Sequence, residues 1–195
     1  MRELLTLCGY EPQELEAESA RVGRAFEMVG ITEEDIVRAK ERIDTYFDVE
    51  LAGVRKILGV ILRDFVNIVL LREQPDVKVG FSFMAPGCQQ LGSALMANFE
   101  NVAWVNPNYT FMIVLGSMFG KLVPVYEASE RLWLRSGGVA HCGMVKCGLG
   151  LLAADMVPKP DLAVTSGFLC DTSSKTVGLI EDWYDVPGYY IDCWQ

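Results

Sequence analysis

The chain has 195 residues, 51% of them hydrophobic, and carries a formal net charge of −9 with a sequence pI near 4.7. A chain of this length can bury one sizeable core together with a small helical appendage. Its acidity excludes the basic surface that would neutralise nucleic-acid phosphates, so nucleic acid is not an expected partner.

The N-terminal third, residues 1 to 75, is predicted to be helical. Thr32 and Asp35 have the spacing of a capping box that starts a helix. From Leu51 to Leu71, apolar residues recur three or four positions apart, as on one face of a helix. This segment nearly reaches membrane-spanning length, but charged side chains interrupt it. We therefore predict a buried amphipathic helix and no membrane contact.

Beyond Pro75, short β-like runs alternate with helix-like stretches, which is typical of parallel strands joined by helical crossovers. We predict an α/β fold over residues 76 to 195, with an open, mostly parallel, doubly wound sheet and ligands at the carboxyl ends of its strands. The β-like runs are Val77 to Phe83, Val102 to Val105, Leu122 to Tyr126, Asp161 to Thr165 and Tyr189 to Asp192. The helix-like stretches are Gly87 to Asn98, Tyr109 to Phe119, Cys142 to Ala154 and Ser173 to Trp183.

The last β-like run reaches the chain end at Cys193, Trp194 and Gln195 with no closing helix after it. We interpret this end as a domain boundary, so that this chain is the first α/β domain of a larger protein.

Six cysteines occur in a chain whose first residues include Glu3, Glu11 and Glu14 and do not resemble a secretory signal. We therefore expect a cytoplasmic protein. Its thiols are expected to be reduced and available for metal binding or redox chemistry, rather than paired in disulfides.

Two cysteines stand at predicted starts of helices. Cys170 follows the run that ends at Thr165 and precedes the helix-like stretch from Ser173, and Cys142 opens another such stretch. A thiol in this position faces the positive end of the helix dipole and nearby backbone N–H groups, which favour an anionic thiolate–metal centre. Two strand-to-helix turns of a doubly wound sheet can bring such cysteines to the same edge.

The remaining cysteines are weaker candidates. Cys147 lies five residues after Cys142, so on a regular helix it points roughly 140° away and belongs to the core; an irregular first turn would let it join the metal site. Cys8, Cys88 and Cys193 are expected to behave as small buried hydrophobes.

Other common sites are weakly supported. His141 is the only histidine, which excludes a site built from several histidines. We expect it at the surface or in a cap, although beside a cluster it could donate a hydrogen bond to sulfide or substrate. No Walker-type loop occurs, so the chain is not expected to hydrolyse ATP, and its glycines do not form the dinucleotide-binding fingerprint.

Three segments follow one another in an order that resembles the 2-hydroxyacyl-CoA dehydratase and benzoyl-CoA reductase subunit family. They are Leu115 to Tyr126, His141 to Lys146, and Asp161 to Val164 leading to the pair Cys170 and Asp171. The resemblance covers roughly residues 78 to 192, the first α/β domain of such a subunit, and the cysteine–aspartate pair after a strand is its most specific element. The helical N-terminal third matches only loosely, as a family extension.

This resemblance implies a function. Subunits of this family hold a 4Fe–4S cluster with three cysteines, of which Cys142 looks like the first and Cys170 like the second; the third would lie beyond Gln195. A separate ATP-dependent iron–sulfur activator would inject one electron at very low potential, and the cluster would pass it to the thioester carbonyl of an acyl-CoA substrate. A homologous partner subunit would share the substrate pocket. The resemblance names no further catalytic residue here and does not separate dehydration from reduction.

Three alternatives remain open at this point. One is a double-cubane cluster protein of the same superfamily that reduces small molecules, for which Cys147 would supply an additional ligand. Another is a scaffold subunit that has the fold without a cluster, which a missing third ligand favours. The third is a zinc-binding module, although the spacing of Cys142 and Cys147 is poor beside the usual Cys-x2-Cys pairs.

Overall fold

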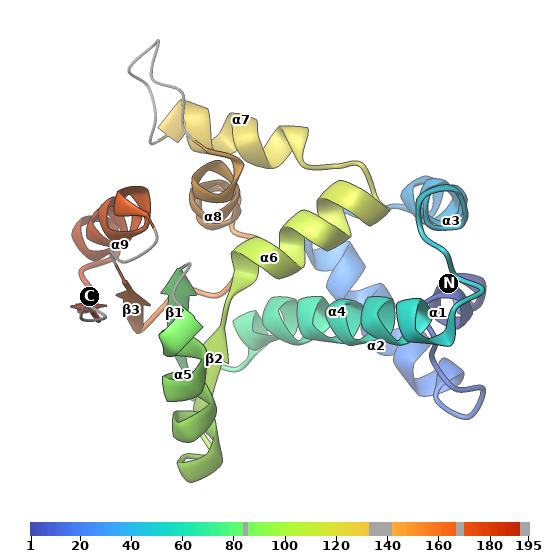
Figure 1. Cartoon of the computed structure of the whole chain (residues 1–195), viewed down its shortest axis with the longest axis horizontal. Helices are drawn as coiled ribbons and strands as arrows, with labels where there is room; N and C mark the ends of the chain where they lie inside the picture. The colour runs from blue at the N-terminus through green and yellow to red at the C-terminus, as the bar shows by residue number, and fades with distance from the viewer. Residues whose placement is uncertain (84–85, 133–141, 167–169, 192–195) are drawn as a thin grey trace.

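The computed structural model describes residues 1–83, 86–132, 142–166 and 170–191. It is an α/β fold in which an open sheet of four parallel strands is flanked by helices (Figure 1). The predicted fold class is confirmed. His141 and Cys193, two residues discussed above, lie outside the described residues.

The N-terminal region is helical, as predicted. Its elements are α1 (Arg2–Leu7), α2 (Leu15–Met28), α3 (Glu33–Tyr46), α4 (Ala52–Leu70) and the short 3-10 turn η1 (Leu71–Glu73). The α4 helix buries Leu58, Leu62 and Phe65 along one face, because their spacing of three and four residues places them above one another. None of the described helices is long and apolar enough to cross a membrane.

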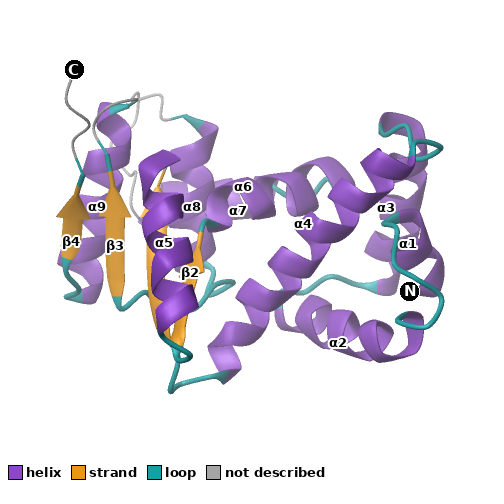
Figure 2. Cartoon of the chain, turned by 60° about the horizontal axis from the view of Figure 1, so that its bottom comes forward, coloured by secondary structure: helices purple, strands orange, loops and turns teal. Residues whose placement is uncertain are grey.

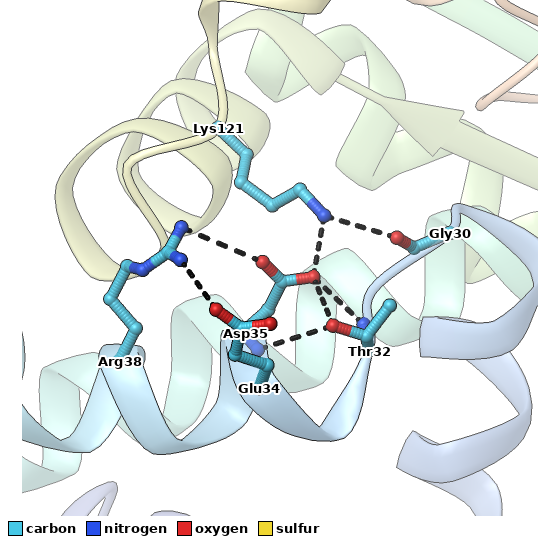
Figure 3. A network of polar contacts seen from close by, with 6 residues as sticks. All are labelled: Gly30, Thr32, Glu34, Asp35, Arg38 and Lys121. Carbon is cyan, nitrogen blue, oxygen red and sulfur yellow. Dashed lines mark hydrogen bonds and ion pairs between the residues drawn. The ribbon is translucent and has the colours of Figure 1, made fainter.

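The predicted capping box forms at the start of α3 and is tied to a distant loop (Figure 3). The backbone N–H of Thr32 donates to Asp35 Oδ2 at 2.8 Å, and the N–H of Asp35 donates to Thr32 Oγ1 at 3.3 Å. Lys121, in the loop before α7, places its Nζ 2.5 Å from Asp35 Oδ2 and 3.1 Å from the carbonyl oxygen of Gly30. This network connects the helical region to the α/β region.

The Asp35 network predicts a pH-dependent part of the stability. Burial opposes ionisation of Asp35, but the hydrogen bonds from Lys121 and Thr32 outweigh it and lower the pKa of this carboxyl to about 2. Since the folded pKa lies below the ordinary value of 3.8, the carboxylate stabilises the fold above about pH 4, and this contribution is lost as the pH falls towards 2. Asp35→Asn is expected to lower the free energy of unfolding by about 2 kcal/mol at neutral pH. It should also make this free energy less dependent on pH between about 4 and 2.

Urea unfolding between neutral pH and about pH 3 measures this effect. Glu34→Gln is the matched control, because the Glu34 side chain is 85% exposed. An Asp35→Asn profile parallel to the wild-type profile throughout this range would contradict the assignment.

The sheet has the strand order β2-β1-β3-β4, and all its pairs are parallel. Its strands are β1 (Lys78–Phe83), β2 (Val102–Val105), β3 (Leu162–Thr165) and β4 (Gly188–Tyr190). Phe81 is paired with Val105 on one side and with Ala163 on the other, so β1 is a central strand. Its almost continuous burial fits a strand covered on both faces.

Helices cover both faces of the sheet (Figure 2). The described helical elements after β1 are α5 (Pro86–Asn98), α6 (Pro107–Phe111), the π-helical turn η2 (Met112–Met118), α7 (Val123–Leu132), α8 (Gly143–Ala153) and α9 (Asp171–Tyr184). The α5 helix lies on one face against β1 and β2, and α9 lies on the other face against β3 and β4. This follows from right-handed crossovers that leave the sheet centre in opposite directions.

The strand predicted from Leu122 to Tyr126 is wrong, because this segment starts α7. The N–H of Tyr126 donates to the carbonyl oxygen of Leu122 at 3.0 Å, which closes a helical turn. Pro124 lies in the first turn of the helix, where its missing N–H costs nothing. Val123 and Val125 alternate with other residues as in a strand, but a run this short is compatible with a strand or with a helix.

The helical region and the α/β region share one hydrophobic core. Phe26 of α2 packs edge-on against Phe119, with ring centroids 5.2 Å apart, and Phe65 of α4 lies 4.5 Å from Phe111 of α6. Residue 75, the predicted boundary, falls between η1 and β1. The two regions therefore differ in secondary structure but are continuous in packing.

Candidate metal centre at the carboxyl edge of the sheet

The connections of the sheet diverge at the carboxyl ends of β1 and β3. After β1 the chain crosses by α5 to β2, and after β3 it crosses by α9 to β4 on the other side. Such a switch in direction opens a crevice where open α/β sheets bind ligands. Cys170 stands at this switch point, as the residue that caps α9 after β3.

Buried hydroxyl groups fix the start of α9 at the carboxyl ends of β1 and β3. Thr165 Oγ1, at the end of β3, and Ser173 Oγ, in the first turn of α9, lie 3.2 Å and 2.9 Å from the carbonyl oxygen of Phe83. The two hydroxyl oxygens are 2.5 Å apart, and both side chains are buried. The helix start is thereby tied to the ends of β1 and β3, so the position of Cys170 is set by the sheet.

The thiol of Cys170 is partly exposed and lies in surroundings that favour its anionic form. Its backbone is extended, with φ −163° and ψ 117°, as is usual for an N-cap residue. The side chain of Thr172 and then the backbone N–H groups of Thr172 and Ser173 lower the pKa of this thiol, while burial and the charge of Asp171 oppose them. The thiolate is the form that binds metals.

Cys142 also precedes a helix, α8, but the element described before it is the helix α7 and not a strand, so the strand-to-helix turn expected at Cys142 is not seen in the described residues. Cys142 is the N-cap of α8, with an extended backbone, and its carbonyl oxygen accepts the N–H of Lys146 at 3.1 Å. Cys142 is an exposed residue. The sequence prediction that Cys142 and Cys170 both precede helices is thus confirmed.

Both cysteines lie towards the same edge of the sheet. The chain leaves the end of α8 and enters β3 through Asp161, whose N–H donates to the carbonyl oxygen of Val79 at the amino end of β1. The end of α8 therefore faces the amino edge, and its start faces the carboxyl edge. Asn108, in the first turn of α6, donates from Nδ2 to the carbonyl oxygen of Met144 in the first turn of α8 at 3.0 Å. The helices α8 and α9, which follow Cys142 and Cys170, are also in contact with each other.

The other described cysteines lie in the core. Cys147 is fully buried on the regular helix α8, where burial raises the pKa of its thiol to about 12, and its Sγ lies 3.8 Å from the carbonyl oxygen of Asn108. Cys8 is also fully buried, and burial raises the pKa of its thiol to about 12. Cys88 is a fully buried residue of α5. A buried neutral thiol does not favour metal ligation. The positions of these three cysteines are therefore those of residues that pack in the core.

Two thiols fit a soft metal or an iron–sulfur centre. Thiolate sulfur is the ligand that iron–sulfur clusters use, and both thiols stand at helix starts where negative charge is favoured. Among residues 1–83, 86–132, 142–166 and 170–191, no group of three or more His, Cys, Asp and Glu side chains gathers to hold a metal. Cys142 and Cys170 are therefore the two candidate thiol donors at this edge.

Two residues near Cys142 were missed by sequence reasoning. Asn108 is 1% exposed, and its Oδ1 has no hydrogen-bond partner in the described part of the chain. Tyr126 reaches the first residue of α8 from α7. A polar residue soon after a strand could have indicated Asn108, but no local signal indicates Tyr126.

A hollow lies at the opposite, amino edge of the sheet. It has a volume of about 700 Å³ and includes the loops that follow α8 and α9. Two of its charged residues take part in ion pairs, since Arg72 binds Asp155 at 2.6 Å and Lys78 binds Asp161 at 2.9 Å, and Lys159 and Asp185 line it as well. Because ligands of open parallel sheets gather at the carboxyl edge, we place the candidate site there and not in this hollow.

The fold and these two cysteines define an α/β protein with an open parallel sheet and a thiol-bearing carboxyl edge. No protein-family model, curated protein or solved structure matches the chain.

Proposed function

We propose that this chain is the iron–sulfur-binding part of an ATP-activated, radical-type 2-hydroxyacyl-CoA dehydratase or benzoyl-CoA reductase. Cys142 and Cys170 are its two cluster ligands. The observation that carries the proposal is that both are N-cap residues of helices that start at the same edge of one parallel sheet. The resemblance of residues 142–146 and 161–171 to that family supports the same two positions.

The electrostatics of the edge support an anionic centre. A cluster with thiolate ligands carries negative charge, and each helix start presents unpaired backbone N–H groups and the positive end of its dipole. At Cys170 the hydroxyl of Thr172 adds a further donor. Hydrogen bonds to sulfur and partial burial are the means by which a protein sets the potential of such a centre.

The chain's own residues have limited tasks in this proposal. Cys142 and Cys170 hold the group, and the hydroxyl network of Thr165 and Ser173 keeps Cys170 in place. A 4Fe–4S cluster bound there would supply one-electron transfer at low potential to the thioester carbonyl of an acyl-CoA. The proposal therefore includes an acyl-CoA substrate, a homologous partner subunit and an ATP-dependent iron–sulfur activator. A third protein ligand would come from outside this chain.

Iron and sulfide analysis of the wild-type chain tests this function. The chain would be incubated anaerobically with iron, sulfide and an excess of a small thiol that substitutes for the third ligand, and then freed of unbound metal. We expect iron and labile sulfide in equal amounts, with the visible absorption of a cluster. Zinc alone would support a zinc module, neither metal would support a cluster-free scaffold, and more iron than one cubane holds would support the double-cubane alternative; each of these results contradicts the proposal.

A further inference from the structure

The hollow at the amino edge of the sheet lies between the helical region and the α/β region. Met28 and Arg72 line it from the helical region, and the loops that follow α8 and α9 line it from the α/β region. Its volume of about 700 Å³ falls within the range of cavities that hold small molecules. The hollow is therefore large enough for a ligand of its own, apart from the candidate metal centre at the carboxyl edge.

Proline residues and buried valines make part of this lining rigid and apolar. Pro158 and Pro160 are buried in the loop between α8 and β3, and Pro187 directly precedes β4. The pyrrolidine ring fixes φ, so these segments have little conformational freedom to lose when a ligand binds. Val79 and Val157 are 3% and 2% exposed and give the hollow an apolar surface.

The charged residues of the lining leave one cation and one carboxylate without an ion-pair partner. Arg72, Asp155 and Asp161 form the ion pairs described above. The other two charged residues of the lining are Lys159 and Asp185, and neither forms an ion pair among the residues that the structure describes. The hollow therefore presents one unpaired charge of each sign to a ligand.

Asp185 lies where α9 ends. Its backbone is left-handed, with φ 52° and ψ 53°, and its N–H donates to the carbonyl oxygen of Glu181 at 2.9 Å. Glycine and asparagine are the usual residues in this position, and the partial negative charge of a helix end disfavours an acid there. The helix end and the carboxylate together favour a bound ammonium group.

Lys159 supplies the opposite charge close to the same helix end. Its Nζ lies 5.6 Å from the centre of the Tyr184 ring, and Tyr184 is the last residue of α9. Tyr184 and Asp185 are neighbours in the chain, and both Lys159 and Asp185 line the hollow. The two unpaired charges therefore belong to the same part of the hollow, where one small molecule can meet both.

We infer that this hollow binds a free α-amino acid with an apolar side chain. The ammonium group of the amino acid pairs with Asp185, and its carboxylate pairs with Lys159. Its side chain lies against the apolar surface that includes Val79 and Val157. This site is separate from Cys142 and Cys170 and does not depend on the proposed iron–sulfur function.

Calorimetric titration of the whole chain with L-leucine tests the inference. We expect saturable binding of leucine with a Kd of about 1 mM or lower. Leucinamide lacks the carboxylate and N-acetyl-leucine lacks the ammonium group, so each is expected to bind about threefold to tenfold more weakly than leucine.

Two variants assign the charges of the ligand to the two residues. Lys159→Gln should weaken leucine binding about threefold to tenfold, but it should not weaken the binding of leucinamide, which has no carboxylate. Asp185→Asn keeps a residue that tolerates the left-handed backbone. It should weaken leucine binding by a similar factor without weakening that of N-acetyl-leucine. Lys56→Gln is the matched control, because Lys56 is exposed on α4 and should leave the affinity for leucine unchanged.

Absence of leucine binding up to about 10 mM would overturn the inference. Equal affinities for leucine, leucinamide and N-acetyl-leucine would also overturn it, because the two charges would then contribute nothing. Wild-type affinity for leucine in both Lys159→Gln and Asp185→Asn would show that leucine binds elsewhere. None of these results bears on the proposed function, which is tested by the iron content.

Discussion

Replacing Cys170 with serine is expected to remove the iron that the reconstituted chain binds. The serine hydroxyl stays protonated near neutral pH and is a poor substitute for a thiolate towards iron. The fold should persist, because the start of α9 is fixed by Thr165 and Ser173 and because a serine oxygen can cap the helix as well as a sulfur can. Iron and labile sulfide per chain are the quantities to measure, with the thermal melting curve as the check on folding.

Cys8→Ala is the control for this experiment. Cys8 ends α1 in the helical region, where its thiol is buried away from the carboxyl edge of the sheet. Its replacement should leave the iron content unchanged, although a small loss of stability is expected from the cavity. Full iron retention in Cys170→Ser would refute the ligand role of Cys170, and equal iron loss in both variants would indicate that iron binds without a specific site.

Phe65→Ala is expected to lower the free energy of unfolding by about 3 to 5 kcal/mol. The ring of Phe65 is fully buried on α4, 6.2 Å from the ring of Phe26 and 4.5 Å from that of Phe111. Its removal leaves a cavity where the helical region meets the α/β region, and it also removes two aromatic contacts. Urea unfolding, followed by circular dichroism, measures the change.

Tyr46→Ala is the matched control, because Tyr46 is 67% exposed at the end of α3 and should change the stability by less than about 0.5 kcal/mol. The single core also predicts one cooperative transition for both regions, since they share this aromatic cluster. A loss below 1 kcal/mol in Phe65→Ala, or two separate transitions in the wild type, would contradict this description.

Much of the local structure was predictable because the signals lie within a few residues of one another. The apolar spacing from Leu51 to Leu71 gave α4, which the structure has at Ala52–Leu70. The pair Thr32 and Asp35 gave the start of α3, since a capping box needs only its own four residues. The strand and helix alternation placed Cys142 and Cys170 before helices in the same way.

The segment from Leu122 to Tyr126 was predicted wrongly for a related reason. Two valines on either side of Pro124 alternate as they would in a strand, and no longer period is available in so short a run. The position of this segment is decided by packing, since α7 lies against α8 with backbone contact at Gly150. Local preference is weak in such a case, and tertiary contacts prevail over it.

By itself, the sequence determined that this protein alternates strands with helices after a helical start, and that two of its thiols stand where helices begin. Only the tertiary structure decided that these two helix starts face the same edge of one sheet, that Tyr126 and Asn108 join them there, and that Cys147 is turned into the core. The physical reason is range. Periodicity and capping depend on neighbours in the chain, whereas strand order and the close approach of helices depend on contacts between residues far apart in the sequence.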